Sequence, residues 1–132
     1  MNKELKMIET LKFSPVTDRK GSTESAKRIV KKYFAGDWGD KWELLTPTYR
    51  SNLRIGKEEW VKEAENFPTP QFKIRKVVIQ SGCMAVVIGD LLFSELPRQI
   101  RIGLVRESGP YEPDPKAKYS VVGTTVPPFI AV

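Results

Sequence analysis

The sequence predicts an α+β fold, in which three N-terminal helices pack on a curved, mainly antiparallel sheet of about four strands. Two observations support this class. Apolar residues recur at helical spacing in the first half of the chain, and β-branched residues are concentrated in the second half. Because helices and strands are segregated along the chain rather than alternating, we do not expect a parallel α/β sheet.

The first strong helical signal begins at Ser22 or Thr23, since either side chain can accept a hydrogen bond from the first turn. Apolar side chains then recur three and four positions apart and form one stripe along the helix. They are Ala26, Ile29, Val30, Tyr33 and Phe34. Gly36 is typical of a helix end. We therefore expect a flexible, basic arm over residues 1–21 and one folded domain over residues 22–132.

Two further helical segments are expected before the strands begin. Residues 37–53 read as a broken helix, in which Asp40 caps a short turn and Thr46 caps a restart with Pro47 at the first helical position. Residues 57–66 form the third helix, which carries Trp60 on its apolar side.

Four strand segments follow, rich in β-branched residues and separated by turn residues. The second segment is apolar at both even and odd positions, so we expect a central strand that is covered on both faces. The four expected strands span residues 71–80, 83–93, 96–105 and 116–126. This order predicts an antiparallel meander.

Composition excludes several kinds of chemistry. The chain has 132 residues, no histidine and a single cysteine, Cys83. A histidine-activated nucleophile, an internal disulfide and a cysteine-rich zinc site are therefore ruled out. We expect no metal site and no cofactor. No apolar stretch is long enough for a membrane span.

The net charge of +6 is concentrated near the N-terminus. Residues 1–32 carry nine Lys or Arg and four Asp or Glu, whereas residues 33–132 carry thirteen and twelve. Such a basic segment is suited to phosphates or an anionic membrane. Aromatic residues are not interleaved with these charges, which favours a solvated tail and outer helix face over nucleic-acid binding.

The first residues, MNKELKMIETLK, have no apolar core of a signal peptide. Two localisations stay open. The protein is cytoplasmic, or it is exported and its leader has been replaced by Met1.

Three segments carry a resemblance to a known superfamily. They are the amphipathic helix SAKRIVKKYFAGDW, the broken segment DKWELLTPTYRSNL and the helix GKEEWVKEAENF, followed by a sheet that starts at QFKIRKVVI. Together they resemble the nuclear transport factor two-like (cystatin-like) superfamily over residues 22–126. The resemblance implies a cone-shaped cavity between sheet and helices. Its members include isomerases and dehydratases as well as non-catalytic binding, dimerising and accessory domains.

Asp90 is the candidate catalytic residue. It follows Gly89 within VVIGDLLF, a segment with no other charge. A carboxylate between apolar walls would have a raised pKa and could transfer a proton. The resemblance implies an acid in the cavity of isomerase-like members. The competing interpretation is that Gly89 and Asp90 form a bulge, with the carboxylate in solvent or beside an arginine.

Candidate ligand-binding residues come from the aromatic and basic positions. Tyr33, Trp42, Tyr49 and Trp60 either line a cavity for a small apolar ligand or form the core between helices and sheet. Arg101, with Arg98, either clamps an anionic ligand or lies on a solvated sheet face.

These observations favour a non-catalytic ligand-binding or protein-interaction domain. The partner is a second copy, through the sheet face, or a larger protein assembly. The alternative is a small isomerase- or dehydratase-like enzyme, with Asp90 as base and Tyr33 or Tyr49 as donor. A third reading is nucleic-acid binding through the basic first helix.

Overall fold

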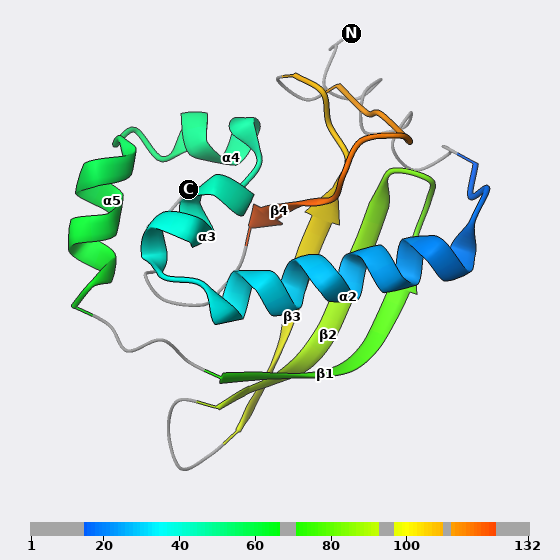
Figure 1. Cartoon of the computed structure of the whole chain (residues 1–132), viewed down its shortest axis with the longest axis horizontal. Helices are drawn as coiled ribbons and strands as arrows, with labels where there is room; N and C mark the ends of the chain where they lie inside the picture. The colour runs from blue at the N-terminus through cyan, green and yellow to red at the C-terminus, as the bar shows by residue number, and fades with distance from the viewer. Residues whose placement is uncertain (1–14, 67–70, 93–96, 110–111, 124–132) are drawn as a thin grey trace, which may run out of the picture.

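The computed structural model describes residues 15–66, 71–92, 97–109 and 112–123 of the chain. Within them, four helices precede a four-stranded sheet of order β1-β2-β3-β4, in which every neighbouring pair is antiparallel. The elements are α2 (Arg19–Ala35), α3 (Trp38–Leu44), α4 (Pro47–Asn52), α5 (Lys57–Ala64), β1 (Gln71–Ile79), β2 (Met84–Leu92), β3 (Arg98–Val105) and β4 (Ser120–Gly123). The α+β prediction is confirmed. Figure 1 shows α2 lying across β1 and β2, with the three shorter helices grouped beyond its C-terminal end.

The long helix starts earlier than the sequence suggested. The side chain of Asp18, rather than Ser22 or Thr23, accepts the hydrogen bond from the first turn, from the backbone N–H of Gly21 at 2.9 Å. Helix α2 therefore begins at Arg19, within the segment 1–21 that was predicted to be a flexible arm. Gly36 does end the helix, and its N–H donates to the carbonyl of Lys32.

The broken segment is two helices rather than one. Asp37 caps α3, and Asp40 completes a reciprocal capping box at the third helical position, so the prediction that Asp40 is the cap was wrong. The restart was predicted correctly, because the Thr46 side chain accepts from the N–H of Tyr49 and Pro47 begins α4.

The sheet has two different faces. Every second side chain along β2 lies beneath the helices and joins the core. Among them, Ala85, Val87 and Leu91 are only 0–2% exposed. The side chains that alternate with them, such as Val86 and Ile88, are half-buried. The expectation of a strand covered on both faces was therefore wrong, because the described helices pack against only one face.

The last strand begins later than predicted. A turn holds residues 114–117, where Asp114 accepts hydrogen bonds from the N–H groups of Ala117 and Lys116, so pairing begins only at Ser120. The predicted arm up to residue 14 and the apolar C-terminus from residue 124 lie outside the described residues. Among the residues described, no helix has both the length and the hydropathy needed to cross a membrane.

Candidate functional site

Three of the four aromatic candidates lie in the core. Tyr33, Trp60 and Trp42 are 1%, 3% and 8% exposed. The Trp60 ring contacts Trp38 edge-on at 5.7 Å between centroids and Trp42 at 5.5 Å. These rings pack on one another, so they fill the space between α2, α3 and α5. Tyr49, on α4, is half-buried at the margin of the same core.

Lys41 is buried beside these rings, a position that the sequence reading missed. Its amine donates to the carbonyl of Gly36 and lies 5.1 Å from the Trp38 ring centroid and 5.5 Å from that of Tyr33. Burial lowers the pKa of Lys41, and the carboxylates of Asp37 and Asp40 act in the opposite direction. The signal was present: Lys41 stands three residues after Trp38, on the stripe that also carries Trp42 and Leu45.

The two tyrosine candidates hold their protons tightly. Burial raises the pKa of Tyr33 well above its ordinary value, and the proximity of Tyr49 adds to the effect. Burial also raises the pKa of Tyr49. Both side chains are therefore neutral at physiological pH, as a hydrogen-bond donor would need to be.

Asp90 lies away from these tyrosines. It projects from the β2 face opposite Gly89 and Leu91, and its carboxylate forms a 2.6 Å ion pair with Arg75 of β1. The irregularity predicted at Gly89-Asp90 lies instead in the neighbouring strand, where the register shifts between Ile74 and Lys76. Arg75 is the extra residue of this bulge, and its side chain reaches Asp90, whose direct register partner is Lys73. The structure does not bring the proposed base and its tyrosine donor together.

Gly89 has a packing role on the inner face. A Cβ atom there would lie 2.3 Å from the backbone oxygen of Lys73 and 2.5 Å from Cζ of Phe72. The Phe72 ring therefore occupies the space that a side chain at position 89 would need. It stacks on Phe34 of α2, with ring centroids 4.7 Å apart and planes 13° apart.

The outer face of the sheet carries an aliphatic row that none of the described helices covers. The register aligns Val78 with Val86 and Val86 with Gly103, and the Cβ of Val122 lies 3.8 Å from where a Cβ at Gly103 would stand. We call Val78, Val86, Gly103 and Val122 the outer band. Val122 is 40% exposed, one of the two large hydrophobic side chains in the described residues that are exposed.

Of the two basic candidates, Arg101 lies on this face, whereas Arg98 pairs with Leu91 and belongs to the inner face. Arg98 and Arg101 are exposed, and Arg101 stands directly across from Ile88, whose other neighbour is Lys76. This row of two cations around an isoleucine borders the outer band. Cys83 lies buried against Met84 and Val105.

No group of three or more His, Cys, Asp or Glu side chains in the described part of the chain is placed to hold a metal ion. Comparison of the chain with protein-family models, with curated proteins and with solved structures finds no match.

Proposed function

We propose that the chain is a non-catalytic protein-interaction domain that pairs with a second copy of itself through the outer face of its sheet. The observation that carries the proposal is the outer band. Aliphatic side chains cross β1, β2 and β4 on a face against which none of the described helices packs. An apolar patch of this kind, with half-buried valines beside the exposed Val122, is typical of interaction sites.

Two placements favour interaction over catalysis. Asp90 is paired with Arg75 outside the core, and Tyr33 is packed inside it. The enzyme alternative needs the carboxylate and a tyrosine hydroxyl on one substrate. The helix-then-sheet order also agrees with the resemblance to the nuclear transport factor two-like superfamily, and we propose membership on that basis.

Self-pairing avoids a clash of like charges in one arrangement. The cationic row of Lys76 and Arg101 lies on one side of the outer band, and Met84, Val105 and Ser120 form the row on its other side. A two-fold axis that runs across the strands along the band would place each cationic row over the partner's uncharged row. Such an isologous contact is the commonest way in which homodimers form.

The size of the face predicts a weak, reversible dimer. A face four strands wide, at about 4.8 Å per strand, and as long as β3, at about 3.3 Å per residue, has an area of roughly 500 Å². Stable interfaces bury about 800 Å² on each partner. We therefore expect a monomer–dimer equilibrium within the micromolar range.

Sedimentation equilibrium tests the proposal from low to high micromolar concentration. Val86→Lys places a charge in the centre of the outer band and should shift the protein to monomer. Asn52→Lys adds the same charge on exposed α4 and is the matched control, which should dimerise like the parent chain. A parent chain that stays monomeric throughout the range would contradict the proposal.

A further inference from the structure

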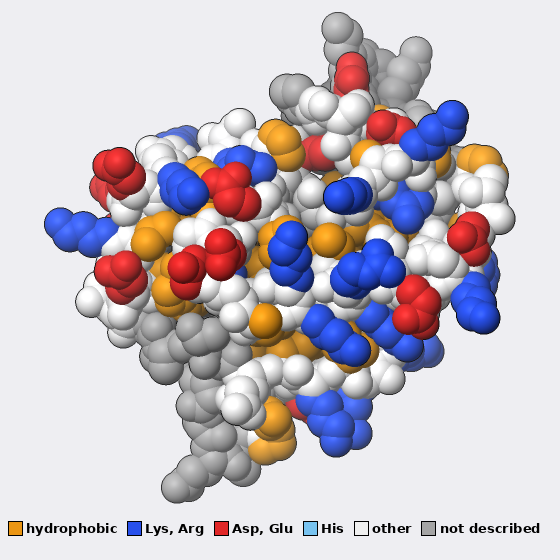
Figure 2. All heavy atoms as spheres, in the orientation of Figure 1, with side chains coloured by type: hydrophobic (Ala, Val, Ile, Leu, Met, Phe, Trp, Pro, Cys, Tyr) orange, Lys and Arg blue, Asp and Glu red, His pale blue; other side chains and the backbone are white. Residues whose placement is uncertain are grey.

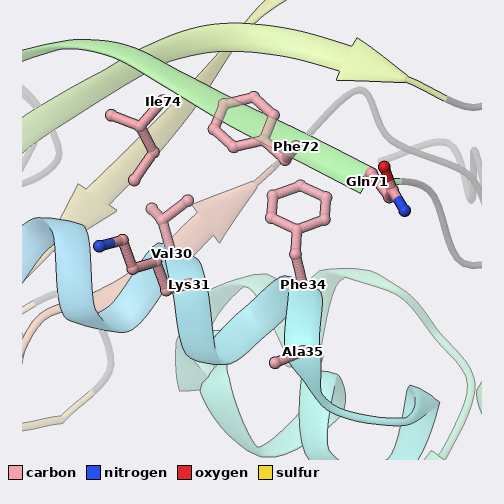
Figure 3. Close-up of a pocket in the computed structure, with 7 residues that line it drawn as sticks. All are labelled: Val30, Lys31, Phe34, Ala35, Gln71, Phe72 and Ile74. Carbon is pink, nitrogen blue, oxygen red and sulfur yellow. The ribbon is translucent and has the colours of Figure 1, made fainter.

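A groove lies between the C-terminal half of α2 and the first residues of β1. Its volume is about 440 Å³. Figure 3 shows its walls as two facing pairs, with Ile74 opposite Val30 and Phe72 opposite Phe34. The walls are therefore apolar, and they come from two elements that are far apart in the sequence.

The walls are also held in place before any ligand arrives. Val30 is fully buried, and Phe72 is fixed between the Phe34 ring and the backbone at Gly89, where there is no side chain. A preformed apolar site loses less conformational entropy on binding than a flexible one.

The helix that forms one wall of the groove is strongly basic. Lys31 and the amide of Gln71 are the polar side chains that line the groove, and no acidic residue lines it. Helix α2 carries six Lys or Arg and one Glu, whereas the three cations of β1 lie on the outer face of the sheet, away from the groove. Only two ion pairs to acids involve these elements in the described residues, Lys27–Glu24 at 3.9 Å and Arg75–Asp90 at 2.6 Å. In Figure 2, Lys and Arg side chains gather over α2 and near β1, with hydrophobic surface visible between them.

We propose that this groove binds an acidic peptide segment of a partner protein. One large apolar side chain of the peptide packs against Ile74 and against the Phe34–Phe72 pair, and the buried Val30 supports these walls from within the core. Flanking carboxylates of the peptide lie near Lys31, at the rim of the groove. The apolar walls select the side chain, and the basic rim selects the charge of its neighbours.

The geometry favours a peptide over the two other polyanions. Phe34 and Phe72 stack on each other, so each ring already uses one face that a nucleic-acid base would need. A lipid bilayer presents a broad surface, whereas the apolar walls here lie within a groove between a helix and a strand. This inference does not depend on the proposed dimer, because the groove lies between α2 and β1 and not on the outer band.

Fluorescence anisotropy tests the proposal with a labelled peptide of Asp and Glu that contains one central Phe. A second peptide has Ala in place of Phe, and a third has Lys in place of every acid. We expect the first to bind most tightly, with an affinity that falls as salt is added. The Ala peptide should bind several-fold more weakly, and the Lys peptide should not bind.

Two variants of the same helix locate the site. Lys31→Glu reverses a charge at the rim and should weaken binding of the first peptide about tenfold. Lys20→Glu makes the same change about 16 Å further along α2 and should weaken it less than twofold. Ala35→Trp, at an exposed lining position, should abolish the preference for Phe over Ala. Circular dichroism confirms folding, and Lys31→Gln replaces Lys31→Glu if that variant is unfolded.

Several results would overturn the proposal. One is equal weakening by Lys31→Glu and Lys20→Glu, since this indicates diffuse attraction along α2. Another is equal affinity for the Phe and Ala peptides, or no binding at all. Tighter binding of a single-stranded oligothymidylate, or of vesicles that contain phosphatidylserine, would assign the basic surface to nucleic acid or to a membrane instead.

Discussion

The two faces of β2 differ in a way that separates stability from interaction. On the inner face, Ala85, Val87 and Leu91 are at most 2% exposed and Gly89 lies beneath an aromatic ring. On the outer face, Val86 and Ile88 are half-buried and Asp90 is ion-paired with a neighbouring strand. The residues alternate in one short stretch of chain, yet only the inner set is fully enclosed.

This difference between the faces indicates which residues serve stability and which are available to bind a partner. A side chain enclosed by the core contributes to stability through burial and packing, and it has no surface to offer a partner. Substitution of an outer-face side chain costs little free energy of unfolding, and such side chains keep accessible surface for a partner. We therefore expect inner-face substitutions to change the free energy of unfolding, and outer-face substitutions to change association.

The largest expected difference in unfolding free energy is between substitutions of two glycines, one on each face of the sheet. Gly89→Ala should lower the free energy of unfolding by about 3 kcal/mol, since its Cβ meets a backbone oxygen that cannot move without parting the strands. Gly103→Ala should change it by less than about 0.5 kcal/mol, because its Cβ meets only Val122, at an ordinary distance. Urea unfolding measures both. Equal losses would show that the two faces are equally packed.

Two adjacent valines give the next largest difference. Val87→Ala leaves a cavity at a fully buried position and should cost about 2 kcal/mol of unfolding free energy. Val86→Ala, on the outer band, should cost less than about 1 kcal/mol. The same urea experiment, run at concentrations where the chain is monomeric, makes the comparison. A cost at Val86 as large as that at Val87 would indicate that the outer face is covered in the monomer.

The Asp90–Arg75 pair tests whether the carboxylate is structural. Arg75 is 56% exposed and Asp90 17%, so the coupling between them should be about 0.5–1 kcal/mol and should shrink as salt is added. A double-mutant cycle with Asp90→Asn and Arg75→Gln measures it through urea unfolding. A coupling of zero at low salt would mean that the pair does not persist in solution.

The sequence predicted the elements whose signals are local. Thr46 with Pro47, and Gly36, marked helix boundaries because each acts through its own backbone or through a hydrogen bond within a few residues. Asp18 was missed because the apolar stripe begins only after the first turn of α2. The strand segments were found, since β-branched residues cluster there. The second strand was wrongly predicted to be covered on both faces, because Val86 and Ile88 are as apolar as the core.

The candidate site depended on contacts that no local pattern encodes. Asp90 stands in an apolar strand, and its partner Arg75 lies fifteen positions away in a bulge of another strand. The Phe34–Phe72 groove likewise joins α2 to β1 across the tertiary fold. The spacing of residues therefore suggested which side chains were unusual, whereas the fold decided what each of them faces.

The smallest expected effect is a dependence of the unfolding free energy on pH. It arises from titrating groups in the core and not from the outer face of the sheet. Because burial raises the pKa of Tyr33 in the folded state, its hydroxyl ionises first in the unfolded chain as the pH passes about 10. Its contribution to stability is therefore complete below that pH and is lost above it. Lys41 acts in the opposite direction, since its lowered pKa makes folding more favourable as the pH rises towards its ordinary value of 10.5.

Urea unfolding from about pH 8 to 11 separates the two groups. Tyr33→Phe should reduce the loss of stability above pH 10, with Tyr49 accounting for the remainder, and should leave the rise due to Lys41. Lys41→Met should remove the rise and leave the loss. Substitutions on the outer band, such as Val86→Ala, should shift the whole curve without changing its shape, because they touch no titrating group of the core. A change of shape on Val86→Ala would show that the two faces of the sheet are coupled, and that core and interaction surface cannot be altered independently.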